Sequence, residues 1–147
     1  MATTYGEDLT AGTEYTLGEY TLTEAEVLDF AKAWDPQDFH TDPEAAQAGA
    51  YRGIIASGIQ TMAVMQRLAV QHVYVGWAVI AGRRADDVRF LRPVRPGDTL
   101  TGTAVLRKVA AEPLGRTGID LDIELTVDGR PVMTASFDVL VRSRPGD

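Results

Sequence analysis

The clearest pattern in the chain is an alternation of apolar and polar residues near its C-terminal end. Apolar residues fill every second position from Ile119 to Val127, and acidic or hydroxyl side chains fill the positions between them. A period of two is typical of a β-strand with one buried face. Asp128-Gly129 then predicts a hairpin turn, and a second alternating run from Met133 to Val141 predicts the returning strand. We therefore expect an antiparallel hairpin here.

Further strands are predicted upstream of this hairpin. The segment 98–109 is expected to pair with 117–128 across a loop that contains Pro113 and Gly115. A strand around 88–91 is separated from it by prolines and a glycine, which interrupt regular structure. A short strand is expected within 13–22. Together these segments predict an antiparallel sheet of about five strands.

The first half of the chain has helical signals instead. Thr23 and Glu26 have the spacing of a capping box, and apolar residues follow at helical spacing up to Trp34. Pro36 disfavours helical geometry at Asp35, so the helix is expected to end there. Asp42-Pro43 predicts the start of a second, short helix, with the aspartate as N-cap and the proline at the first helical position.

The longest predicted helix runs from Gly58 to about His72. It is apolar nearly all round, which is typical of a helix buried on most sides. The sheet and this helix predict the α+β class, with one long helix packed against one sheet face. The length of 147 residues fits one domain, 1–147, with a sizeable core.

Composition narrows the classes of function. The chain has no cysteine, which excludes disulfides, thiolate metal sites and a cysteine nucleophile. The net charge of −7 argues against nucleic acid as a partner. The start of the chain lacks the pattern of a signal peptide, and no apolar run is long enough to cross a bilayer. We therefore expect a cytoplasmic protein without a membrane partner.

One segment, Asp35 to Asp42, could carry proton-transfer chemistry. It holds His40, one of two histidines, five positions after Asp35. On spacing alone, the favoured interpretation is that the segment only separates two helices. The alternative is a catalytic pair, because an imidazole near a carboxylate is a common general base near neutral pH. Metal binding is the weakest interpretation, because no second histidine lies at ligand spacing.

A second candidate is Ser57-Gly58 at the start of the long helix. The first backbone N–H groups of a helix have no partner inside it, and glycine lets a ligand approach them closely. The Gly58 amide could therefore act as an oxyanion hole beside the acid and the histidine. Equally, Ser57 could serve only as the N-cap.

Five arginines fall within thirteen residues of this otherwise acidic chain. Their favoured interpretation is a solvated strand face, and the alternative is a basic rim that meets a phosphorylated carrier. These residues are Arg83, Arg84, Arg89, Arg92 and Arg95.

The order of these parts resembles the MaoC-like dehydratases, the (R)-specific enoyl-CoA hydratases of the hotdog superfamily. Their signature, Asp-x-Asn-Pro-x-His-x-Asp, is similar to Asp35-Pro36-Gln37-Asp38-Phe39-His40-Thr41-Asp42, with Gln37 and Asp38 in place of asparagine and proline. The glycine at the head of the long helix and the segment 88–98 continue the resemblance, which covers roughly 13–141.

The resemblance implies a hotdog fold, in which the sheet wraps the long helix, and a homodimer or a higher oligomer of dimers. It also implies reversible addition of water to an enoyl thioester of coenzyme A or an acyl carrier protein, with no metal or redox cofactor. Asp35 and His40 would move the proton and the Gly58 amide would stabilise the enolate. We expect four further residues to contact the substrate: Gln37, Ser57, Ile59 and Met62. Acyl specificity is expected to involve Met62, Met65, Trp77 and Phe90.

Two other functions stay open at this point. A hotdog enzyme could use the same pair for dehydration or cyclisation of a polyketide-like intermediate. Alternatively, the chain could be a non-catalytic acyl-binding subunit in which Gln37 and Asp38 mark a decayed site.

Overall fold

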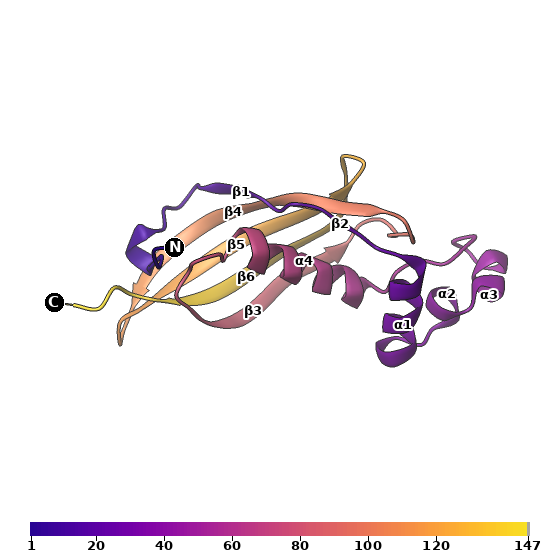
Figure 1. Cartoon of the computed structure of the whole chain (residues 1–147), viewed down its shortest axis with the longest axis horizontal. Coiled ribbons are helices and arrows are strands. Elements are labelled where there is room, and N and C mark those ends of the chain that lie inside the picture. Colours follow the sequence, from indigo (N-terminus) through magenta and orange to yellow (C-terminus); the bar gives the residue numbers. More distant parts are fainter. Residues whose placement is uncertain (147) are drawn as a thin grey trace.

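An antiparallel sheet forms one layer of the computed structural model, which describes residues 1–146 (Figure 1). Its path runs β1-β4-β5-β6-β3, and β2 pairs separately with β4. The strands are β1 (Glu14–Thr16), β2 (Tyr20–Thr21), β3 (Val79–Phe90), β4 (Thr99–Glu112), β5 (Arg116–Val127) and β6 (Arg130–Arg142). The prediction of an antiparallel sheet is confirmed, but the strand expected within 13–22 divides into β1 and β2.

The predicted C-terminal hairpin is confirmed in detail. Asp128 and Gly129 take φ angles of 50° and 75°, the left-handed conformation that the tight turn between β5 and β6 requires. Val127 lies opposite Arg130, and Ile123 lies opposite Ala135. This register places the apolar half of each alternating run on the same sheet face.

The helical elements are the 3₁₀ turn η1 (Gly6–Asp8), α1 (Glu24–Trp34), α2 (Asp38–Thr41), α3 (Pro43–Ala48) and α4 (Gly58–His72). Helices α1, α3 and α4 begin where the sequence signals place them, whereas η1 and α2 were not predicted. The amide of Glu26 donates to Thr23 Oγ1 and the Thr23 amide donates to Glu26 Oε1, both at 3.2 Å, so the predicted capping box is present. Asp42 caps α3 as predicted.

Two expectations about the first half of the chain are wrong. The Asp35–Asp42 segment, expected only to separate two helices, itself contains the single helical turn α2 at residues 38–41. Trp34 is 75% exposed although it continues the apolar stripe of α1. The stripe is right for Val27 and Ala31, which are fully buried, but not for Trp34, the last residue of α1.

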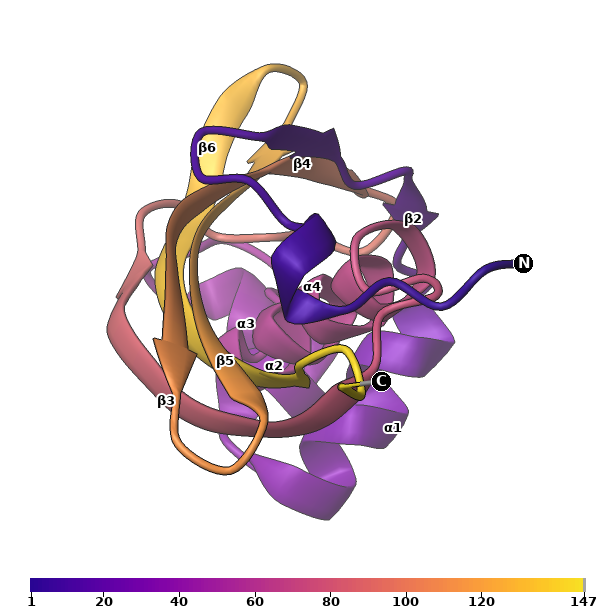
Figure 2. The ribbon, with the colours of Figure 1, turned by 90° about the vertical axis from the view of Figure 1, so that its left-hand side faces the viewer.

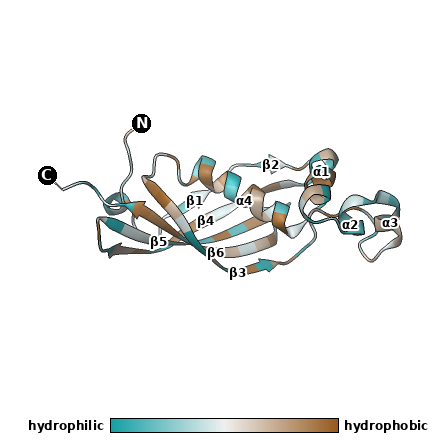
Figure 3. Ribbon diagram, turned by 90° about the horizontal axis from the view of Figure 1, so that it is seen from below, coloured by the Kyte–Doolittle hydropathy of each residue, from teal (hydrophilic) through white to brown (hydrophobic). Residues whose placement is uncertain are grey.

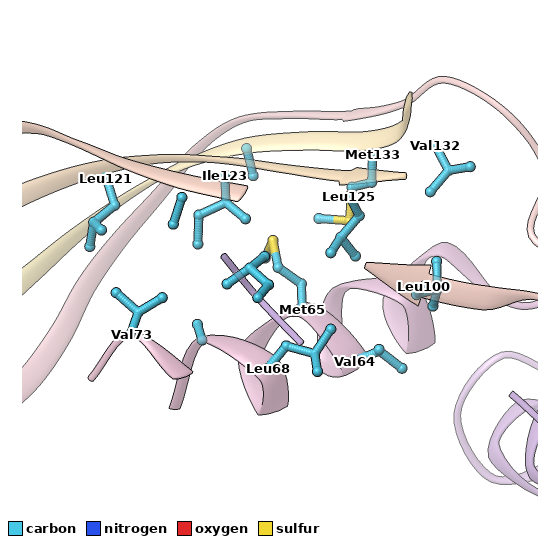
Figure 4. Close-up of a cluster of buried hydrophobic side chains, with 14 of the residues drawn as sticks. Val64, Met65, Leu68, Val73, Leu100, Leu121, Ile123, Leu125, Val132 and Met133 are labelled. Carbon is cyan, nitrogen blue, oxygen red and sulfur yellow. The ribbon is translucent and has the colours of Figure 1, made fainter. Parts of the chain in front are cut away.

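The core lies between α4 and the curved sheet (Figure 2). Met65 and Leu68 of α4 point toward side chains of β5 and β6, and all of them are buried (Figure 4). The opposite side of α4 is open, with Ile59 56% and Val70 50% exposed. The expectation of a helix buried on most sides is therefore wrong for the single chain, in which α4 buries one face.

Helices α1, α2 and α3 lie together beyond the N-terminal end of α4 (Figure 3). This grouping brings the end of α1, the turn α2 and the start of α4 to one end of the molecule. Within residues 1–146, no helix combines the length and apolar character needed to cross a membrane.

Candidate active site

A cavity of about 470 Å³ opens where these helices meet the sheet. The helical side of the molecule contributes Asp35, Gln37, His40, Tyr51, Gly58 and Ile59 to its wall. Residues 90–94, at and beyond the end of β3, and Val132 of β6 form the facing side. Thus the structure brings the predicted acid, histidine and glycine to one cavity, although 23 positions separate Asp35 from Gly58 in the sequence.

His40 is held in a fixed orientation inside this cavity. It is only 4% exposed, and its Nδ1 lies 2.7 Å from the Ile55 carbonyl oxygen. A carbonyl only accepts hydrogen bonds, so Nδ1 donates and a neutral ring leaves the Nε2 lone pair free. That Nε2 lies 3.3 Å from Asp35 Oδ2. The hydrogen bond to the Ile55 carbonyl therefore fixes the tautomer of neutral His40 in which the unprotonated Nε2 lies beside the Asp35 carboxylate.

Two neighbours orient the Asp35 carboxylate. The Gln37 side-chain amide donates to Oδ1 and the Ser57 hydroxyl donates to Oδ2, each at 2.7 Å. The Gln37 bond contributes most to lowering the pKa of Asp35, the Ser57 bond adds to it, and the nearby His40 adds less, whereas burial opposes the change. Asp35 is therefore held as a carboxylate that accepts hydrogen bonds.

A Gln37→Leu substitution is expected to raise the pKa of Asp35, because it removes the hydrogen bond that most stabilises the ionised form. If catalysis needs the carboxylate, the acidic limb of the kcat/KM profile moves to higher pH, since protonation then begins nearer neutrality. Gln37→Asn, which keeps an amide, is the matched control and is expected to shift the limb less. An acidic limb that is identical in wild type and Gln37→Leu would contradict this role.

Gly58 is the first residue of α4 and lines the same cavity. Its neighbour Ser57 caps the helix by accepting a hydrogen bond from the Ile59 amide at 3.2 Å. No acceptor within residues 1–146 takes the Gly58 N–H, as expected for the first turn of a helix. A Cβ at position 58 would lie 2.9 Å from ring carbons of Phe90, so a larger residue there would have to displace that ring. The amide is thus a free donor in the cavity wall.

The other predicted contact residues lie in different places. Gln37 and Ile59 line the cavity, whereas Ser57 is fully buried behind the Asp35 carboxylate. Met62 is absent from this wall and borders a separate shallow hollow on the open side of α4.

Of the residues expected to control acyl specificity, only Phe90 lines the main cavity. Met62 and Met65 border the hollow on α4, and Trp77 borders another apolar hollow near the C-terminal end of that helix. Asp38 is exposed at the start of α2, and the carboxylate that lies beside His40 is that of Asp35.

Two features of the site were not predicted. One is the hydrogen bond between His40 and the Ile55 carbonyl, because the sequence does not show which backbone group a side chain will contact. The other is the bond from Ser57 to Asp35, although the N-cap signal did single out Ser57. Across residues 1–146, no three histidine or carboxylate side chains gather as a metal site would require.

The sheet wrapped around α4 and the site at the head of that helix together define a class of protein. The family model for the MaoC like domain matches residues 8–118, and the chain belongs to this family. Its fold is the hotdog fold. The expected family and fold are both confirmed.

Individual relatives agree with this assignment. The chain is 36% identical over 110 residues to 3-hydroxyacyl-thioester dehydratase Z of Mycobacterium tuberculosis, a match that covers 74% of this chain and 72% of that protein. It is 38% identical over 93 residues to the Bacillus subtilis protein YdeM. This match covers 59% of this chain and 66% of that relative, so the chain spans just under two thirds of the length of YdeM. The structure of the monoamine oxidase regulatory protein of Archaeoglobus fulgius superimposes with a TM-score of 0.90 at 28% identity, over 99% and 98% of the two chains.

Proposed function

We propose that this chain catalyses the reversible hydration of a 2-enoyl thioester to a 3-hydroxyacyl thioester. Membership of a hydratase and dehydratase family and similarity to a 3-hydroxyacyl-thioester dehydratase support this reaction class. The observation that carries the proposal is the geometry of Asp35 and His40. Their Oδ2 and Nε2 atoms lie 3.3 Å apart in a cavity that Gly58 also lines.

The pair suits the activation of water. The neutral ring offers an Nε2 lone pair and the carboxylate offers Oδ2, so two acceptors face the same point. A substrate water between them would donate one hydrogen to each and direct an oxygen lone pair at the β-carbon of the enoyl group. The water proton passes to His40 Nε2 as the C–O bond forms.

Negative charge then develops on the thioester oxygen, because the π electrons of the double bond move toward the carbonyl. The Gly58 N–H is the donor best suited to stabilise this enolate. The imidazolium returns the proton to the α-carbon on the same face, which restores the thioester and the neutral ring. The net reaction adds the elements of water in a syn sense, and its reverse is the dehydration.

The site does not have the features of a decayed one. Gln37, which differs from the asparagine of the family signature, reaches the Asp35 carboxylate at 2.7 Å, and Asp38 is exposed outside the cavity wall. These contacts favour an enzyme over a non-catalytic subunit. The open edge of β3 and the half-exposed apolar residues on α4 further support a homodimer, which the mass in solution would test.

The direct test is an assay of purified protein with crotonyl-CoA and with longer 2-enoyl-CoA thioesters. We expect loss of the enoyl absorbance and formation of the 3-hydroxyacyl thioester, without added metal or redox cofactor. Chiral analysis of the product gives the face of addition. If neither hydration nor dehydration of any of these thioesters exceeds the rate in buffer, the proposed function is wrong.

A further inference from the structure

The five arginines between positions 83 and 95 are of two kinds in the structure. Arg83 binds Glu112 and Asp138 across the sheet, with nitrogen–oxygen distances of 2.6 Å to each. Arg84 and Arg89 each pair with an aspartate of β3, at 2.6 and 2.8 Å. The charges of these three arginines are therefore neutralised locally, which fits the interpretation as a solvated strand face.

Arg92 and Arg95 differ from these three. Within residues 1–146, no carboxylate lies at ion-pair distance from either guanidinium, and both side chains are exposed. Each is held by a backbone carbonyl instead, Arg92 by Pro131 and Arg95 by Tyr51, both at 2.6 Å. A carbonyl fixes the direction of a guanidinium without cancelling its charge. Since a guanidinium has five N–H donors, most of them stay available to a ligand.

One of these two arginines lines the cavity described above, and the other is hydrogen-bonded to a residue of its wall. Arg92 lines the cavity directly. Arg95 is anchored on Tyr51, which lines the helical side, while Arg92 is anchored beside Val132, which lines the sheet side. The two uncompensated positive charges are therefore tied to two different walls of the cavity that holds Asp35 and His40.

The charge of the rest of the chain makes these two arginines selective. With a net charge of −7, most of the surface repels an anion, and a local positive pair would attract one to the cavity. The planar guanidinium is especially suited to phosphate oxygens, which it binds through two parallel hydrogen bonds. Coenzyme A and the prosthetic arm of acyl carrier proteins both present phosphate groups at the far end of a thioester.

We propose that Arg92 and Arg95 form a phosphate-binding rim that recognises the carrier portion of the thioester substrate. This inference rests on the proposed function, because it assigns the carrier for the same cavity. Arg92 and Arg95 would act on substrate affinity, and the chemistry at the acyl group would remain with Asp35, His40 and Gly58.

The test compares three crotonyl thioesters that differ only in the carrier: coenzyme A, 4′-phosphopantetheine and pantetheine, which lacks phosphate. The measured quantity is the ratio of kcat/KM for the coenzyme A thioester to kcat/KM for the pantetheine thioester. Arg92→Gln with Arg95→Gln is expected to lower this ratio roughly tenfold or more, as the loss of charge-assisted hydrogen bonds implies. Arg89→Gln removes the same charge from a paired arginine and is the matched control, with an unchanged ratio expected.

The phosphopantetheine thioester locates the phosphate. If it behaves like the coenzyme A thioester, the rim binds the phosphate of the arm; if it behaves like the pantetheine thioester, the rim binds the nucleotide phosphates. An equal loss of activity with all three carriers, or the same change of ratio in Arg89→Gln, would overturn the proposal.

The rim can also be tested apart from catalysis. Calorimetry with coenzyme A alone is expected to show binding that weakens with added salt, and weaker binding still in the Arg92→Gln, Arg95→Gln double variant. If wild type hydrates none of the three thioesters, the proposed function fails, and calorimetry alone decides on the rim. Equal coenzyme A binding by wild type and the double variant would overturn it.

Discussion

Asp35→Asn and His40→Gln are each expected to lower kcat for hydration of crotonyl-CoA by roughly 10²–10⁴-fold, the usual contribution of a positioned acid or base. The Asp35→Asn variant would keep the size of the side chain but lose the ionised oxygen that lies 3.3 Å from His40 Nε2. The His40→Gln variant would lose the ring lone pair that the Ile55 carbonyl directs toward Asp35. Steady-state rates with each variant provide the measurement.

The double variant is expected to be little worse than the worse single variant. Asp35 and His40 would bind the same water, so removal of either one disables the shared step and the effects are not additive. Losses that multiply across the double variant would indicate that the two residues act independently.

Asp38→Asn is the matched control for Asp35→Asn. It makes the same chemical change two positions before His40, on an exposed carboxylate outside the cavity wall. We expect its kcat to stay close to that of wild type, and its thermal unfolding to match that of Asp35→Asn. Equal losses in both aspartate variants would assign the effect to net charge near the site and not to the pair.

Met65→Ala is expected to lower the free energy of unfolding by about 2–5 kcal/mol, the range for truncating a fully buried large side chain. Met65 is 1% exposed and lies in the core between α4 and the sheet (Figure 4). The truncation would leave a cavity that the surrounding strands can fill only in part. Urea denaturation followed by circular dichroism measures the change.

Gln71→Ala serves as the control on the same helix, because Gln71 is exposed near its C-terminal end. It is expected to change stability by about 0.5 kcal/mol or less, as most surface substitutions do. A Met65→Ala protein as stable as this control would contradict the packing of α4 against the sheet.

Local signals in the sequence predicted much of the fold. The Thr23–Glu26 capping box and the Asp128-Gly129 turn depend on residues a few positions apart, so the sequence contains all the information they need. The same holds for Asp42 at the start of α3. These elements appear where they were predicted because little else in the chain competes with them.

Features set by distant parts of the chain could not be predicted in this way. Arg83 meets Glu112 and Asp138 only because the strand order places β3 beside β6 and lets its side chain reach β4. Gln60 of α4 is buried, and its side-chain amide nitrogen donates to the Glu26 carbonyl of α1, a helix-to-helix contact that periodicity does not reveal. Trp34 follows an apolar stripe, but the fold provides nothing to cover it.

Part of the candidate site could also be predicted from the sequence. Resemblance to the family signature singled out Asp35, His40 and Gly58, and the structure places all three at one cavity. The roles of Arg92 and Arg95 could not be separated from those of their neighbours, because their sequence surroundings look alike. Only the presence or absence of a carboxylate partner distinguishes them.

The Ser57 hydroxyl makes two hydrogen bonds, and a substitution of this residue changes both of them together. The same oxygen accepts the Ile59 amide at the start of α4 and donates to Asp35 Oδ2. Substitutions at position 57 should therefore weaken the helix and misalign the carboxylate together, whereas those at the exposed Gln37 can alter the carboxylate alone. In a library of variants of this chain, substitutions at position 57 would lower heat tolerance and turnover together. Substitutions at position 37 would change turnover without a matching change in heat tolerance.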